Sequence, residues 1–214
     1  MQDQDGKTPL HLAAEFRNFE ATKSLLNQGA NFHMRDKFGK NLVHQAAESG
    51  SRAVLELFLE TPAREFGRDN EGNGLLHFLA MWEWPPVVQN YIKRKRPIID
   101  ITNKKKRTPL HHAAIHGNVA VVTVLLKQGA AMDKHDGIGC TALHHAAQQG
   151  HEDVVRLLLR HSADVLTTDK FQRTCVQNAL AGGHLSLVRS LWHQRLNVNN
   201  KDKWGKTALH QAAR

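Results

Sequence analysis

Fifteen histidines are the residues of this 214-residue chain best suited to metal binding or acid–base catalysis. His112 and His116 are four residues apart, a spacing that places two imidazoles on one face of a helix, where they can hold zinc. His145 lies 33 residues after His112, and we expect it about one helix spacing (~10 Å) away. Because no cysteine or carboxylate completes a tetrahedral ligand set beside these histidines, we predict no metal site and no cofactor.

The two cysteines, Cys140 and Cys175, are too few for a disulfide scaffold and suit the reducing cytosol or nucleus. The chain has no nucleophile elbow, Walker loop, dinucleotide-binding glycine motif or kinase signature. Because the repeats described below also occupy every segment of the chain and leave no insertion for an active site, we predict that the protein is not an enzyme.

Composition narrows the class of protein further. Apolar residues make up 41% of the chain and charged residues 23%, which argues against both a disordered tail and a membrane protein. No uninterrupted apolar run approaches the ~18 residues that a membrane-spanning helix needs. The first residues lack the basic start and apolar stretch of a signal peptide. We expect no transmembrane segment and a location in the cytoplasm, the nucleus or both.

The elements that must position the histidines repeat along the whole chain. A four-residue motif, usually ending in histidine, begins every 33 residues, with one step of 34. An alanine pair commonly follows it, as at Ala113 and Ala114. The seven copies of the motif are Thr8–His11, Asn41–His44, Gly74–His77, Thr108–His111, Thr141–His144, Thr174–Gln177 and Thr207–His210.

Each repeat predicts two short helices and a turn. The threonine hydroxyl caps the first helix, and Pro9 or Pro109 occupies the first helical position, where no N–H is needed. The small alanines let another helix approach closely, and a glycine such as Gly150 ends the helix. A second helix carries apolar pairs such as Leu158-Leu159. Because helices this short are marginal alone, each unit must bury its apolar face against the next.

The run Thr108–Ala114 and the stretch Gly150–Leu159 closely resemble the ankyrin repeat, and the resemblance covers the chain in seven units. It implies an all-α solenoid of antiparallel helix pairs joined by β-hairpin fingers, with every segment used by the scaffold. It also implies that the motif histidines hold neighbouring units together through backbone and threonine hydrogen bonds. The expected units are residues 4–36, 37–69, 70–103, 104–136, 137–169, 170–202 and the incomplete 203–214.

Departures from the pattern fall in four units. In the third, Glu83–Pro86 replaces the usual Gly-His and helix start, and one residue is inserted before Thr108. The finger that follows has Lys106 where glycine is expected, and the sixth unit has Gln177 in place of histidine. The seventh unit stops after its first helix, so we expect this chain to be a fragment of a longer protein that continues beyond Arg214.

The resemblance also implies that a partner lies on the concave face formed by finger tips and first helices. Large apolar residues recur in the fingers three residues before the motif, which favours a non-catalytic protein-interaction scaffold or adaptor. We expect the protein to be a monomer. Two alternatives stay open: Phe38 and Phe171 pack on neighbouring fingers, and Trp82 and Trp84 fill space in the irregular third unit. The predicted partner-binding residues are Phe38, Met81, Trp82, Lys104, Lys105, Arg107, Ile115, His116, Ile138, Phe171, Arg173 and Trp204.

A basic segment at residues 93–107 carries eight Lys or Arg residues against Asp100 alone, while the rest of the chain is nearly neutral. Its first part is Lys93, Arg94, Lys95 and Arg96, and residues 104–107 form the second. The segment resembles a nuclear import signal. It also fits an acidic ligand, meaning an acidic peptide, nucleic acid or anionic lipid. The third interpretation is a solvated helix end and finger, since lysines are favoured near a helix C-terminus.

Overall fold

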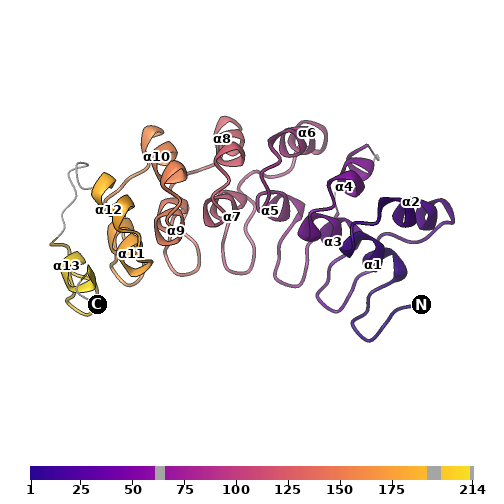
Figure 1. The fold of residues 1–214 in the computed structure, drawn as a ribbon, viewed down its shortest axis with the longest axis horizontal. Helices are drawn as coiled ribbons and strands as arrows, with labels where there is room; N and C mark the ends of the chain where they lie inside the picture. Colours follow the sequence, from indigo (N-terminus) through magenta and orange to yellow (C-terminus); the bar gives the residue numbers. More distant parts are fainter. Residues whose placement is uncertain (61–65, 192–198, 213–214) are drawn as a thin grey trace.

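The computed structural model describes residues 1–60, 66–191 and 199–212, whose helices form two rows along an arch (Figure 1). The inner row lies on the concave side, and loops extend from it as fingers. The inner helices are α1 (Pro9–Glu15), α3 (Leu42–Ser49), α5 (Leu75–Leu79), α7 (Pro109–Ile115), α9 (Ala142–Gln149), α11 (Cys175–Ala181) and α13 (Ala208–Ala212). The outer helices are α2 (Phe19–Asn27), α4 (Arg52–Leu59), α6 (Pro85–Lys95), α8 (Val119–Lys127), α10 (Glu152–Arg160) and α12 (Leu185–Leu191).

Helix boundaries follow the local chemistry of the repeat. The Asn41 side chain caps α3 by accepting from the backbone N–H groups of Val43 and His44. Gly50 ends the same helix in the left-handed conformation, at φ 79°. Pro109 opens α7 at a position whose N–H has no partner in a helix.

Packing between neighbouring units holds these short helices in place. Each inner helix contacts the next inner helix along the arch, from α1 to α13. Ala46, Ala47, Ala113 and Ala114 are fully buried, and their small side chains allow this close approach. The outer helices add leucines such as Leu125, and burying one leucine side chain contributes about 1.5–3 kcal/mol. The result is one core that runs the length of the solenoid, as the repeat predicts.

The fingers are short, tight antiparallel turns with little strand structure. In the described ranges, the β-bridges are isolated pairs between Arg68 and Gly74 and between Thr168 and Thr174. In each finger an aspartate or asparagine closes the turn: Asp36 Oδ1 accepts from the backbone N–H groups of Phe38 and Lys40 at 2.9 and 2.8 Å. The five-residue turn therefore stands without a strand ladder of its own.

Backbone hydrogen bonds also join each finger to the next. The N–H of Lys37 donates to the Asp5 carbonyl and that of Lys203 to the Phe171 carbonyl, both at 2.9 Å. The accepting carbonyls belong to the row of tip residues that the sequence singles out. The residues whose carbonyls accept these bonds are, in chain order, Asp5, Phe38, Glu71, Lys105, Ile138 and Phe171. This ladder fixes the tips as one ribbon and leaves the tip side chains to project from it.

The third unit is as irregular as its sequence predicts. Helix α5 is only five residues long, and α6 begins at Pro85. The Trp82 ring stacks on Trp84 with centroids 5.3 Å apart, and the Trp82 indole N–H donates to the Ala47 carbonyl at 2.6 Å. These two tryptophans therefore pack the junction between the second and third units.

Among the described helices, none has the length and apolar character needed to cross a bilayer.

Candidate interaction surface

The motif histidines are structural, as the resemblance implies. Nδ1 of His111 accepts from the backbone N–H of Thr108 at 3.1 Å, so its Nε2 carries the proton and donates to the Cys140 carbonyl at 3.1 Å. The same bridge between units recurs at His11, His44, His77 and His144. Burial lowers the pKa of His111 to about 4, which keeps the ring neutral in this role.

Gln177 replaces histidine in the sixth unit and keeps both contacts. Its Oε1 accepts from the Thr174 N–H at 3.0 Å, and its Nε2 donates to the Lys206 carbonyl at 3.1 Å. The histidine in the Gly-His position is also structural, because His151 Nε2 donates to the Ile115 carbonyl across units at 2.9 Å.

His112 and His116, the pair with zinc-ligand spacing, do not face a common point. The His112 ring packs edge-on against His77 with centroids 5.2 Å apart, and its Nε2 lies 3.4 Å from Asn103 Nδ2. Burial lowers the pKa of His112 to about 3. His116, by contrast, is exposed at the end of α7. The two imidazoles therefore lie in different surroundings.

His145 has neighbours that the sequence analysis missed. Ligand atoms of Asp136, Cys140 and His145 all lie within 4.8 Å of one another, so a carboxylate and a thiol do accompany this histidine. The 33-residue recurrence of the finger aspartates was the available signal. Asp136 Oδ2 contacts both His145 Nε2, at 2.9 Å, and Arg107 Nε, at 3.2 Å. These groups form a finger-bracing network in which a cation already faces the carboxylate.

The finger tips present apolar side chains to solvent. Phe38 is 49% exposed, Ile138 41% and Trp204 60%. Phe171 is half-buried because its ring stacks on Trp204, with centroids 5.7 Å apart and planes 13° apart. Finger residues therefore do pack on neighbouring fingers at Phe171, whereas Phe38 and Ile138 project.

Cations surround these aromatic rings. Lys203 Nζ lies 4.4 Å from the centre of the Phe171 ring and 4.5 Å from that of Trp204. The guanidinium of Arg173 lies 5.0 Å from the centre of the Phe171 ring and also pairs with the buried carboxylate of Asp169. Cation–π contacts of this kind are worth about 0.5–1 kcal/mol at exposed sites. They hold the two C-terminal tips as a positively charged aromatic cluster.

The first-helix residues predicted to bind a partner are less exposed than the tips. Met81 and Trp82 are half-buried, since Met81 packs against the apolar core and Trp82 stacks on Trp84. Ile115 is half-buried and His116 is exposed at the end of α7. Among the predicted cations, Lys104 and Lys105 are exposed, whereas Arg107 and Arg173 pair with buried finger aspartates.

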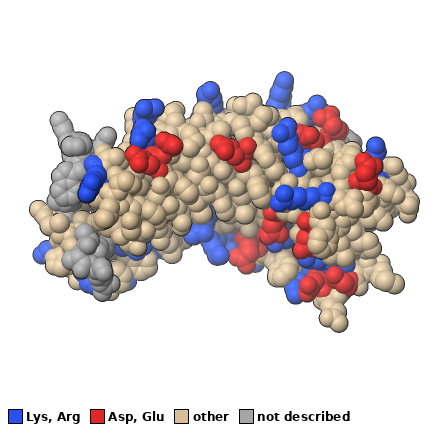
Figure 2. All heavy atoms as spheres, in the orientation of Figure 1, with Lys and Arg blue, Asp and Glu red and all other residues tan. Residues whose placement is uncertain are grey.

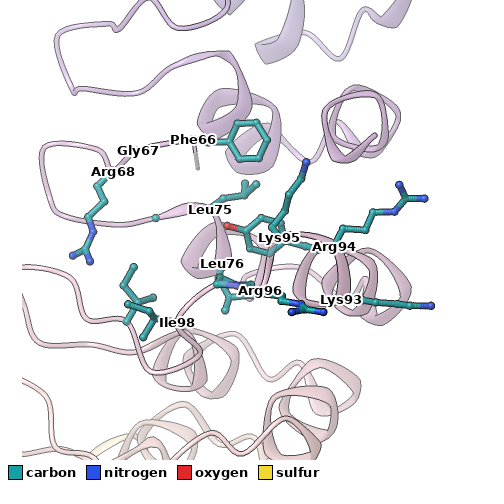
Figure 3. A pocket seen from close by; sticks show the side chains of 14 residues that line it. Phe66, Gly67, Arg68, Leu75, Leu76, Lys93, Arg94, Lys95, Arg96 and Ile98 are labelled. Carbon is teal, nitrogen blue, oxygen red and sulfur yellow. The ribbon is translucent and has the colours of Figure 1, made fainter. Parts of the chain in front are cut away.

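The basic segment does not form one surface, which corrects its treatment as a unit. Residues 93–96 end the outer helix α6, whereas residues 104–107 form a finger on the other side of the arch (Figure 1). The first part borders a cavity of about 740 Å³ between α6 and the preceding finger, with Phe66, Leu75 and Tyr91 among its lining residues (Figure 3). Arg94 also pairs with Glu60, at the end of α4, at 2.9 Å.

Stacked helix pairs, fingers joined tip to tip and histidine bridges between units define a tandem-repeat solenoid that presents a continuous concave surface. A family model described as ankyrin repeats in three copies matches residues 1–70 and 76–169. The chain belongs to the ankyrin repeat family, whose members are generally non-catalytic protein-interaction modules.

Solved structures support the same assignment. The ankyrin repeat domain of Bcl-3, described as a unique member of the IkappaB protein family, is 25% identical to this chain, with a TM-score of 0.72. The match covers 98% of this chain and 95% of that domain. A comparison with curated protein sequences finds no match.

Proposed function

We propose that this chain is a scaffold or adaptor that binds one protein partner along its concave face, through the finger tips and the adjoining ends of the first helices. The observation that carries the proposal is the row of projecting apolar tips, represented by Phe38, Ile138 and Trp204. Isolated apolar side chains on a surface are ordinary, but these recur at one position of a ribbon that the backbone holds rigid.

Burial of this row of side chains by a partner would contribute to the free energy of binding. Complete burial of one such side chain contributes about 1.5–3 kcal/mol, and because these three are 41–60% exposed in the free protein, a partner gains about half of that from each. The three anchors together therefore contribute roughly 2–5 kcal/mol to recognition. The surrounding lysines and histidines provide the polar rim that interaction sites commonly have. The scaffold supplies the rigidity, because backbone hydrogen bonds join each finger to its neighbour.

Selection of binding peptides from a random display library tests the proposal. The selected peptides are measured against a variant with Phe38, Ile138 and Trp204 replaced by alanine. We expect roughly a hundredfold loss of affinity, which corresponds to about 2.7 kcal/mol for the three partly exposed side chains together. Circular dichroism verifies the fold.

A matched control replaces three equally exposed apolar residues that lie away from the fingers and inner helices. Ile98, Leu166 and Leu185 are 71%, 55% and 57% exposed. Their replacement by alanine should leave affinity unchanged. If the selected peptides bind the finger variant undiminished and lose binding to this control variant, the partner surface is not the concave face.

A further inference from the structure

The fingers differ in charge between the two halves of the solenoid. The four C-terminal five-residue turns, 103–107, 136–140, 169–173 and 202–206, carry eight Lys or Arg against three Asp. The three N-terminal turns, 3–7, 36–40 and 69–73, carry three Lys against five Asp or Glu. In Figure 2 the acidic side chains along the lower edge of the molecule lie in its right, N-terminal half. The fingers are therefore net negative in the N-terminal half of the concave face and net positive in the C-terminal half.

The ion pairs made by finger residues differ between the two halves. In the first two units a finger lysine pairs with a glutamate eight residues later, Lys7 with Glu15 at 2.7 Å and Lys40 with Glu48 at 2.6 Å. The equivalent residues after Arg107, Arg173 and Lys206 are Ile115, Ala181 and Arg214, which supply no carboxylate. In the C-terminal half Arg107 and Arg173 pair instead with the buried Asp136 and Asp169, so the positive charge at the surface of these fingers is carried by their lysines.

The aspartates of the C-terminal fingers do not offset this charge at the surface. Asp136, Asp169 and Asp202 are 4%, 5% and 4% exposed, and each accepts backbone N–H groups inside its own turn. By contrast, Lys104 and Lys170 are exposed. A ligand approaching this half meets ammonium groups rather than carboxylates.

Apolar surface lies beside these cations. A hollow of about 690 Å³ lies at the C-terminal end of the arch, with Leu180, Trp204, Arg173, Lys206 and His210 among its lining residues. Such a hollow offers positive charge and apolar contact to one ligand at once, which suits an acidic side chain and a neighbouring aromatic or aliphatic one.

We propose that the partner is an acidic, extended polypeptide segment with interspersed aromatic residues, bound along the fingers of the C-terminal half. This inference rests on the proposed function and specifies its partner. Successive units stand about 10 Å apart and an extended chain advances about 3.3 Å per residue, so side chains roughly three positions apart meet successive fingers.

A polypeptide fits this surface better than a single-stranded nucleic acid. Nucleic acids bind such grooves by stacking bases on free aromatic faces beside a cationic track. Here Phe171 and Trp204 stack on each other, and Lys203 lies over both rings. The other projecting tip in this half, Ile138, is aliphatic and offers no face for a base.

Defined polymers test the inference with the intact chain. Binding is measured by fluorescence anisotropy for a random copolymer of glutamate and tyrosine, for polyglutamate and for polyuridylate. We expect the glutamate–tyrosine copolymer to bind most tightly. Replacing Lys104, Lys170 and Lys206 by glutamine should weaken it roughly tenfold and flatten its salt dependence.

The matched control replaces Lys7, Lys37 and Lys40, three finger lysines of the N-terminal half, by glutamine. This variant has the same change in net charge and should retain most of the affinity. Equal losses in both variants, or no copolymer binding, would overturn the inference. Tighter binding of polyuridylate that is lost in the C-terminal variant would assign this surface to nucleic acid instead.

These outcomes are separable from those of the proposed function. If library-selected neutral peptides need Phe38, Ile138 and Trp204 but the acidic copolymer does not bind, the concave face still binds protein and only the acidic partner is wrong.

Discussion

His111 Nε2 donates a hydrogen bond to the carbonyl oxygen of Cys140, which lies 29 residues later in the chain, at a distance of 3.1 Å. The bond joins one unit to the finger of the next. Because the donor is a buried side chain and the acceptor a backbone group, the position of each finger depends on the first helix of the preceding unit. The histidines that suggest chemistry in the sequence thus maintain the shape of the binding face.

Replacing His111 with alanine should lower the free energy of unfolding by about 1–3 kcal/mol, because a buried carbonyl and N–H lose their partner. Urea denaturation measures the change. His111→Gln is the matched variant and should retain most of the stability, because Gln177 makes equivalent contacts in the sixth unit. A glutamine variant as unstable as the alanine variant would contradict this role.

Acidification should destabilise the fold well before the carboxylates are protonated. Burial lowers the pKa of His44, His111 and His144 to about 4 and that of His112 to about 3, against about 6.5 in the unfolded chain. The unfolded state therefore binds more protons below pH 6.5.

Stability should be nearly constant from pH 7 to pH 8 and fall steadily from pH 6.5 to pH 4, each histidine contributing about 1.4 kcal/mol per pH unit in that window. Urea midpoints at a series of pH values measure this. A midpoint that does not move between pH 7 and pH 5 would show that these histidines are not buried neutral.

Both thiols should resist modification in the folded protein. Cys140 and Cys175 are free and 1% exposed, and burial raises the pKa of each to about 12. We expect an aromatic disulfide reagent at pH 7.5 to react with neither thiol until urea unfolds the chain, and then with both. Rapid reaction of one thiol without denaturant would place that cysteine at the surface.

Two fingers carry a backbone conformation that suits glycine better than their own residues. Lys106 and Gln172 have φ of 57° and 59°, where the equivalent Gly39, Gly72 and Gly139 have 74–80°. Lys106→Gly should raise the free energy of unfolding by about 1 kcal/mol, because a side chain is strained in this region. Lys106→Ala is the control and should give no such gain.

The sequence predicts the scaffold almost completely, because a 33-residue period needs only local signals repeated many times. The turn at position 106 is one example of this local predictability. The repeat predicts a left-handed residue there, and Lys106 adopts that conformation although it is not a glycine. The motif histidines are equally predictable, since each meets the same surroundings one unit further along.

The site is less predictable because it depends on side-chain contacts between residues of different units. Nothing in the spacing indicates that Arg107 crosses to Asp136 or that Trp82 donates to the Ala47 carbonyl. The basic segment looks continuous in sequence, yet its first part ends the outer helix α6 and its second part forms a finger (Figure 1). Long-range contacts of this kind have no local signature.

Hydrogen–deuterium exchange on a complex with a selected peptide tests the concave-face proposal most directly. Binding should slow exchange in the finger turns and the adjoining ends of α7, α9 and α11, while the outer helices α8 and α10 stay unchanged. Protection confined to the outer helices, with the fingers exchanging as in the free chain, would contradict the account.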